Sequence, residues 1–262
     1  MLNEQDVIAN SVYLALYNQL RSYDDIENLS ELSGVPQNIL AQMLGQKISR
    51  NVRSNFHKIK AQVPTIKKRW IKGETFNELA KKYDFSPLMI ARLVLFSFGW
   101  TKKEFNEALN DITKLTDKRI ADELTQAINN DEVFSPKGQK RATQAGIELE
   151  EKVGNWLKEK GIEFITEKQN KDSVKTPDFL LKSPKNIFGK KTYWVECKAS
   201  FGDEIETRRN LNKQLSYYVK LFGPGIVVYG LGMVERPVNS QDILIISGKM
   251  INNYKENEAK EF

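Results

Sequence analysis

Apolar residues recur at helical spacing through the first half of the chain. The first apolar face is formed by Ile8, Val12, Leu14, Ala15 and Leu20. Comparable amphipathic patterns continue to about residue 130. Apolar positions three and four residues apart lie on one side of a helix. The sequence therefore predicts helices throughout residues 1–130.

Two segments of this region have the pattern of a helix-turn-helix, residues 24–44 and 73–95. In each, a proline begins the second helix, where its missing N–H costs little. The second helix of the later segment is apolar on nearly every side and offers only Arg92 to a nucleic acid, so we expect it to pack in a core. The earlier segment is followed by three candidate phosphate contacts, Lys47, Arg50 and Arg53. An ordinary solvated basic face is the alternative interpretation of these three residues.

The periodicity is lost over residues 131–139, and we place a domain boundary there, between residues 1–134 and 135–262. The sequence of the second domain predicts a helix, a strand, a hairpin, a basic helix and two buried strands. Their expected ranges are 139–160, 162–167, 176–181 with 192–199, 203–221, 225–231 and 242–247. A turn-prone segment, Pro-Lys-Asn…Gly at 184–189, joins the hairpin strands. This alternation predicts a mixed sheet flanked by helices, and an α+β class for the whole chain.

Composition narrows the possible functions. With 40 basic and 34 acidic residues in 262, the net charge is +6 and the pI is about 9.1, which favours an anionic partner. A single cysteine and a single histidine, His57, exclude internal disulfides, paired-cysteine metal sites and multi-histidine zinc sites. The sequence shows no signal peptide. Its longest apolar run, residues 88–98, is too short to span a membrane, so we expect an intracellular protein.

Three polar residues fall where the hairpin strands should pair. Asp178 lies near the start of the first strand, and Glu196 and Lys198 lie in the second. Because strand side chains alternate, Glu196 and Lys198 point to one face and Cys197 to the other. Two carboxylates and one amine would then converge, as expected of a site that binds Mg²⁺ or Mn²⁺ and hydrolyses a phosphodiester. The alternative is a cross-strand ion pair on a solvated sheet.

The wider sequence favours the catalytic interpretation. The segments are KTPDF at 175–179, WVECKASFGD at 194–203, QLSYY at 214–218 and FGPG at 222–225. Together they resemble the TPD-motif family of codanin-interacting-nuclease-like proteins and, through it, the PD-(D/E)xK nuclease superfamily. The resemblance is clearest over residues 167–235. It implies a restriction-endonuclease-like core preceded by tandem helix-turn-helix units. It also implies a Mg²⁺-dependent endonuclease, with DNA as the favoured substrate.

The resemblance also implies roles for individual residues. Asp178 and Glu196 would bind the metal, and Lys198 would place a positive charge beside the attacking water. Gln214 would orient water or phosphate, although it could equally be an exposed neighbour of packed tyrosines. Cys197 completes the candidate metal contacts, but its position on the opposite face suits a small core residue. Candidate phosphate contacts on the following helix are Arg208, Arg209 and Lys213.

The superfamily often adds a carboxylate from the first helix of the core. An apolar stripe predicts the face of this helix that meets the sheet, and it comprises Ala145, Leu149, Val153, Trp156 and Leu157. Glu151 lies nearly opposite the stripe, Glu148 lies to one side, and Glu150 lies at its edge. We therefore expect Glu150 to be the additional metal or water ligand. The alternative is that Glu150, at the edge of the apolar stripe, forms an ordinary salt bridge.

A second class of function fits the same fold. A non-catalytic protein could bind nucleic acid, or dock a protein partner through its helical N-terminal domain. Both classes need a basic surface, but only the nuclease needs Asp178, Glu196 and Lys198 together, and the chain has all three. The sequence does not predict substrate structure, cleavage polarity or oligomeric state.

Overall fold

The computed structural model describes residues 6–169, 176–238 and 240–254 of the chain. The chain divides into two compact units. We call residues 1–44 with 144–262 the sheet unit, and residues 45–143 the helical unit. Two long helices, α3 (Gln37–Ala61) and α9 (Pro136–Glu159), run across the two divisions. That the chain forms two separable domains, with a boundary after residue 134, stays a prediction.

The helical unit consists of short helices around an apolar centre. They are α4 (Val63–Ile71), α5 (Phe76–Tyr83), α6 (Pro87–Phe96), α7 (Lys102–Asn110), the 3-10 turn η1 (Ile112–Lys114) and α8 (Lys118–Asn130), together with the adjoining parts of α3 and α9. Thr75 and Thr101 begin α5 and α7 with capping boxes, which satisfy free N–H groups. Six of the ten residues of α6 are buried, so the prediction that this helix packs in a core is confirmed.

The predicted helix-turn-helix segments contain helix pairs. In the first, α2 (Asp25–Ser33) ends at Gly34, whose φ of 71° is left-handed, and α3 follows. In the second, α5 ends at Asp84 with φ 48°, and the hydroxyl of Ser86 caps α6 by accepting from Met89 N. Left-handed residues commonly end helices in this way. That either pair binds DNA stays a prediction.

One expectation for the N-terminal region is wrong. Residues Val7–Ile8 form a short strand, β1, instead of continuing a helix into α1 (Asn10–Gln19). β1 pairs in parallel with β6 (Met233–Val234), with Val7 opposite Met233. A two-residue strand has no readable periodicity, and its partner lies more than 200 residues away in the sequence. The pairing joins the N-terminal segment to the C-terminal part of the sheet unit.

The sheet unit is built on a five-stranded mixed sheet of order β2-β3-β4-β5-β7. The strands are β2 (Phe164–Thr166), β3 (Phe179–Ile187), β4 (Lys190–Lys198), β5 (Gly225–Tyr229) and β7 (Ile243–Ser247). β2, β3 and β4 are antiparallel neighbours, whereas β5 runs parallel to both β4 and β7. The predicted mixed sheet is confirmed. Short 3-10 turns lie at η2 (Glu167–Gln169) and η4 (Met250–Asn253).

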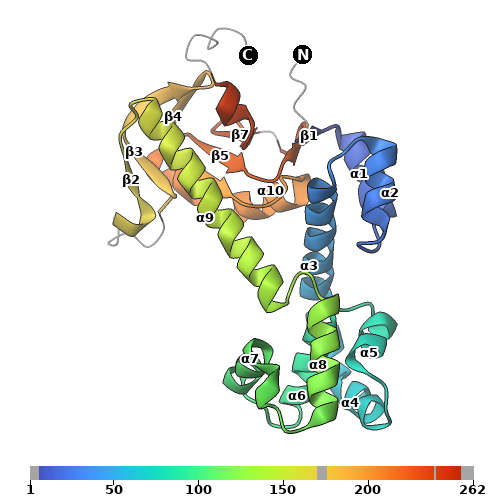
Figure 1. The fold of residues 1–262 in the computed structure, drawn as a ribbon. Coiled ribbons are helices and arrows are strands. Elements are labelled where there is room, and N and C mark those ends of the chain that lie inside the picture. Colours follow the sequence, from blue (N-terminus) through green and yellow to red (C-terminus); the bar gives the residue numbers. More distant parts are fainter. Residues whose placement is uncertain (1–5, 170–175, 239, 255–262) are drawn as a thin grey trace. The chain divides into compact units, whose positions relative to one another are not determined.

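Helices cover both faces of this sheet (Figure 1). On one face, α9 buries Leu149, Val153, Trp156 and Leu157 against a cluster that includes Val195. This is the predicted apolar stripe without Ala145, which is half-buried. On the other face lie α10 (Glu204–Asn210), a π-helical turn η3 (Leu211–Leu215) and α11 (Ser216–Phe222). Their cluster includes Trp194 and Tyr218. Within the described ranges, no helix is long and apolar enough to cross a membrane.

The hairpin turn lies at the glycine end of the predicted turn-prone segment, residues 184–189. Phe188 and Gly189 form the connection, with φ values of 50° and 74°, as two-residue hairpin turns require. Pro184 lies inside β3, where the pairing with β4 is irregular between Leu180 and Lys185. A proline lacks the N–H that a regular ladder needs, so it is tolerated at such an irregularity. The predicted segment therefore contains the turn, but its first residues, 184–186, belong to β3, and both strands extend beyond the expected 176–181 and 192–199.

Candidate active site

The pairing of β3 with β4 brings the two predicted strand carboxylates together. Phe179 is opposite Val195 and Leu180 is opposite Trp194, so Asp178 precedes the ladder beside Glu196. The amide of Asp178 donates to Glu196 Oε2 at 3.3 Å. The carboxylate of Asp178 accepts from the amide of Cys197, at 2.6 Å from Oδ2. Each carboxylate is thus held by the backbone of the other strand.

A chain of hydrogen bonds extends from Glu196 to the helices of the opposite layer. Lys198 Nζ lies 2.5 Å from Glu196 Oε1 and 2.9 Å from Gln214 Oε1. Gln214 Nε2 donates to the hydroxyl of Tyr218 at 2.6 Å, and this hydroxyl donates to the carbonyl of Thr176 at 2.6 Å. The network returns in this way to the segment that carries Asp178. Gln214 is therefore more than an exposed neighbour of packed tyrosines.

Tyr218 joins this network through hydrogen bonds that the sequence did not predict. The sequence placed it near Gln214 only by helical spacing, and gave no sign of its bond to Thr176. Gln214 lies in the π-helical turn η3, between α10 and α11. Such turns often occur at functional sites, because the wider turn changes the direction of the side chains that follow. No local pattern in the sequence predicts this turn.

The electrostatics of the site favour a cation. Burial, and then the charge of Glu196, raise the pKa of Asp178 from 3.8 to about 7, and Glu150 adds to the increase. Burial likewise raises the pKa of Glu196, although Lys198 opposes this. Two close carboxylates with one ammonium group retain negative charge, and a divalent ion would neutralise it. The donor set therefore fits Mg²⁺ or Mn²⁺.

No ready-made metal cage is present in the part of the chain that the structure describes, where no three His, Cys, Asp or Glu side chains converge as ligands. Magnesium does not require one. It is commonly bound through one or two carboxylates, with water and substrate phosphates completing the octahedron. Asp178 and Glu196 satisfy that smaller requirement.

The three glutamates of α9 have different surroundings. Glu150 and Glu151 both line a cleft beside Asp178, and both are exposed. Glu148 is not part of this lining and accepts a hydrogen bond from Gln144, at 3.0 Å. Glu150 is the one of the three that contributes to the raised pKa of Asp178. The surroundings are consistent with the expected role of Glu150, which stays a prediction.

Cys197 has the surroundings of a small core residue. Its side chain packs against the apolar cluster under α9, on the opposite face from Lys198. Burial raises the pKa of its thiol well above the usual range. Metals bind the thiolate, and burial disfavours that form. The structure therefore gives no support to Cys197 as a metal contact.

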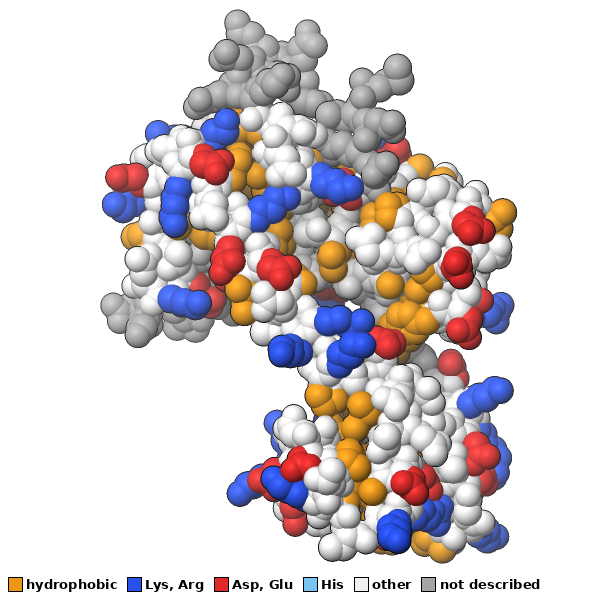
Figure 2. Space-filling view, viewed as in Figure 1, with side chains coloured by type: hydrophobic (Ala, Val, Ile, Leu, Met, Phe, Trp, Pro, Cys, Tyr) orange, Lys and Arg blue, Asp and Glu red, His pale blue; other side chains and the backbone are white. Residues whose placement is uncertain are grey.

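The predicted phosphate contacts lie in both units. In the sheet unit, Arg208 and Arg209 form ion pairs within α10, with Glu204 at 2.8 Å and Glu206 at 3.1 Å. Three further candidates lie on the part of α3 that belongs to the helical unit: Lys47, Arg50 and Arg53. Figure 2 shows basic side chains interspersed with acidic ones on the face in view. A phosphate would have to compete with the existing partners of Arg208 and Arg209.

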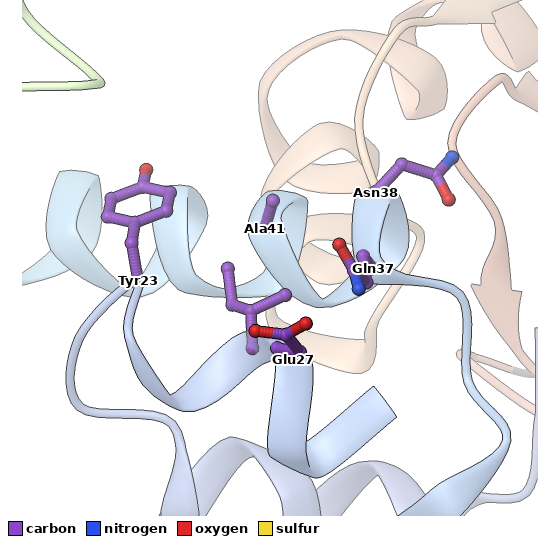
Figure 3. Close-up of a pocket in the computed structure, with 6 residues that line it drawn as sticks. Tyr23, Glu27, Gln37, Asn38 and Ala41 are labelled. Carbon is purple, nitrogen blue, oxygen red and sulfur yellow. The ribbon is translucent and has the colours of Figure 1, made fainter. Parts of the chain in front are cut away.

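A second hollow lies between α2 and the start of α3, with a volume of about 460 Å³ (Figure 3). Tyr23, Glu27, Gln37 and Asn38 supply its polar lining. Gln37 and Asn38 begin the second helix of the first predicted helix-turn-helix. None of Asp178, Glu196 and Lys198 lines this hollow, so we assign it no part in the site.

Comparison with known proteins identifies the family. The family model described as "Protein of unknown function TPD sequence-motif" matches residues 116–250, which contain Asp178, Glu196, Lys198 and Gln214. The chain belongs to this TPD-motif family. No solved structure matches the chain.

The sequence of this chain is similar, over most of its length, to those of several curated relatives. The "CDAN1-interacting nuclease 1" of Homo sapiens is 30% identical over 217 residues, which cover 76% of this chain and 77% of the relative. The protein of the same name from Bos taurus is 29% identical with the same coverage. That from Xenopus tropicalis is 36% identical over 167 residues, 60% of this chain and 55% of the relative. The name of all three describes a nuclease that interacts with a protein, CDAN1.

Proposed function

We propose that this protein is a metal-dependent endonuclease of the PD-(D/E)xK type, with DNA as its favoured substrate. The observation that carries the proposal is the position of Lys198 Nζ, between Glu196 Oε1 at 2.5 Å and Gln214 Oε1 at 2.9 Å. The ammonium group lies beside a paired carboxylate site whose negative charge exceeds its positive charge. The nuclease name of the relatives supports the same reaction class.

The proposed roles follow from the chemistry of each group. Asp178 and Glu196 would hold Mg²⁺ or Mn²⁺, and Glu150 from α9 would bind a water molecule beside the ion. The bound ion would activate water and neutralise charge on the phosphodiester. Lys198 holds a positive charge where negative charge develops during the attack, and such preorganised charge is a major source of catalysis. Gln214 fixes Lys198 in place, and Tyr218 fixes Gln214 through its bond to Thr176.

The helical unit is proposed to help hold the nucleic acid through Lys47, Arg50 and Arg53. Arg53 is the exposed member of the three, so it offers the cleanest test. Arg53→Gln should weaken binding to all sequences alike, and should reduce the slope of log affinity against log salt by about one. An unchanged slope would leave these residues as an ordinary solvated face.

The experiment that tests the catalytic proposal is a cleavage screen over structured DNA and RNA substrates. Wild-type protein should cleave in magnesium or manganese and stop when a chelator is added, whereas Glu196→Gln should bind without cleaving. Robust cleavage in excess chelator would exclude the metal mechanism. Wild-type rates in Glu196→Gln would show that the site is misassigned.

The name of the relatives also favours a second candidate function, docking of a protein partner, since each is named for its interaction with CDAN1. In that case the nuclease-like core would bind nucleic acid or protein without catalysis. Wild-type and Glu196→Gln proteins would then behave alike in the cleavage screen, and neither would produce fragments with any metal.

A further inference from the structure

The cleft beside Asp178 has features that metal binding does not require. Its volume is about 240 Å³, and its lining extends from Glu150 along α9 to Lys158, and across to β2. Pockets that enclose a whole drug-sized ligand typically have volumes of about 300–1,000 Å³. This cleft is therefore large enough for part of one nucleotide and too small for stacked base pairs.

Two phenylalanines line one side of the cleft: Phe164 is half-buried, and Phe179 is 5% exposed. The rings of Phe164 and Phe179 meet edge to face, with centroids 4.9 Å apart. Gly154 on α9 faces Phe179, and a Cβ atom there would lie 3.2 Å from the ring. The absence of a side chain at this position lets the ring lie close against the helix. Phe179 is thereby buried against α9 and supports Phe164, the more exposed of the two rings and the one on which a nucleobase would stack.

The rest of the lining offers polar groups without internal partners. Lys158 and Lys168 are exposed, and neither forms an ion pair within the described residues, although acidic side chains line the same cleft. The amide of Asn155 likewise makes no hydrogen bond to any residue that the structure describes. Two ammonium groups and one amide therefore remain available to a ligand.

The positions of these groups along α9 suit a nucleic-acid strand. A helix rises about 1.5 Å per residue, so Lys158 lies about 12 Å along α9 from Glu150. A strand whose scissile phosphate lies at Asp178 would bring a neighbouring phosphate towards Lys158. The cleft between these two positions would receive the intervening base.

We propose that this cleft binds one unstacked nucleotide next to the scissile phosphate, with its base against Phe164 and its phosphates near Lys158 and Lys168. The inference rests on the proposed nuclease function and specifies its substrate class. A paired base cannot enter such a cleft without leaving its stack, which costs free energy that an unpaired base does not lose. The preferred substrates are therefore single strands, overhangs and flaps, rather than blunt duplexes.

The test is a comparison of affinities in the Glu196→Gln background, where cleavage does not interfere. Fluorescence anisotropy would compare three DNA probes of equal length: a single strand, a blunt duplex and a duplex with an overhang. The single strand and the overhang should bind about fivefold more tightly than the blunt duplex, the scale of a stacked base together with phosphate contacts.

Two independent variants remove this preference by different means. Lys158→Gln with Lys168→Gln removes the charges, and Asn155→Phe fills the cleft from an exposed position. Each should weaken binding of the single strand about fivefold and leave binding of the blunt duplex nearly unchanged. Lys185→Gln is the matched control, because Lys185 is an exposed lysine of β3 outside the cleft.

The outcomes separate this inference from the nuclease proposal. Equal affinity for the three probes, or equal loss on all probes in the cleft variants, overturns the nucleotide site even if the wild type cleaves DNA. A preference that both variants abolish supports the site. If the wild type then cleaves nothing in magnesium or manganese, the nuclease proposal fails and the cleft stands as a binding site.

Discussion

Asp178 and Glu196 are linked through the backbone as well as through their charges. The amide of Asp178 donates to Glu196 Oε2 at 3.3 Å, and the carboxylate of Asp178 accepts in turn from the amide of Cys197, the residue after Glu196. The backbone therefore keeps two carboxylates close together although they repel each other. The structure thus stores an electrostatic cost at this position, which a bound cation would relieve.

This cost predicts how the stability of the metal-free protein depends on pH. The pKa of Asp178 is raised from 3.8 to about 7, so the folded state binds more protons than the unfolded state between these values. Stability should therefore fall as the pH rises from about 4 to about 7. In chelator, the melting temperature of wild type should decrease over this range more than that of Asp178→Asn.

Magnesium provides the second half of that test. An ion that binds the folded state alone stabilises it. At about pH 8, where Asp178 is ionised, magnesium should raise the melting temperature of wild type more than that of Asp178→Asn. Identical pH profiles and identical magnesium responses in the two proteins would contradict the electrostatic account of the site.

Lys198 should contribute to stability as well as to catalysis. Glu196 is 2% exposed, and Lys198 is the partner that balances its charge. Removing one partner of a buried pair commonly costs about 3 kcal/mol, so Lys198→Met should lower the free energy of unfolding by roughly this amount. Denaturant unfolding in chelator measures the effect.

The matched control neutralises both partners. Lys198→Met combined with Glu196→Gln should recover much of the lost stability, because no uncompensated charge stays buried. It should have no cleavage activity. If the double variant is no more stable than Lys198→Met alone, the loss comes from packing rather than charge.

The local parts of this fold could be predicted from the sequence. The apolar stripe of α9 and the buried strands β5 and β7 follow from short-range periodicity. The proximity of Asp178 to Glu196 follows from the pairing of two neighbouring strands. The features that the sequence did not predict depend on residues far away along the chain or on irregular backbone geometry. β1 pairs with residues more than 200 positions away, and the π-helical turn at Gln214 has no composition of its own.

The same distinction explains why the hairpin strands extend further towards the turn than the sequence predicts. Pro184 and Asn186 are typical turn residues, whereas Phe188 is a poor candidate for a left-handed turn position. In the structure Phe188 adopts φ 50°, and its ring lies 4.5 Å from that of Tyr254. A tertiary contact of this kind is invisible to local propensity. The site itself was more predictable than its supporting network, because its residues lie on adjacent strands.

The three glutamates of α9 give a comparison within one helix. Glu150→Gln should reduce cleavage about tenfold or more, because its carboxylate lines the cleft beside Asp178 and contributes to the local negative charge. Glu148→Gln should have little effect, since Glu148 bonds Gln144 instead. Glu151→Gln should also have little effect. Equal, small losses in the rate of cleavage at all three would leave the site with Asp178, Glu196 and Lys198.

The N-terminal segment should be required for the stability of the sheet unit. Tyr13 donates its hydroxyl to Asp203 Oδ2 at 2.6 Å, and both residues are buried. The other oxygen of Asp203 accepts from the amide of Glu206 and so caps α10, which leads to Gln214. The ring of Tyr13 also stacks on that of Phe201, with centroids 5.7 Å apart.

Tyr13→Phe keeps the stacked ring and removes the hydrogen bond to a buried carboxylate, so it should lower the free energy of unfolding by about 2 kcal/mol. Deleting residues 1–20 removes β1, Asp6 and Tyr13 together and should cost more, since Asp6 also accepts a hydrogen bond from Ser247 at 3.2 Å. Val12→Ala, at an exposed position of α1, is the control and should change stability little. Denaturant unfolding distinguishes the three. If the truncated protein unfolds at the same denaturant concentration as wild type, the N-terminal segment is only attached to the sheet unit and does not support it.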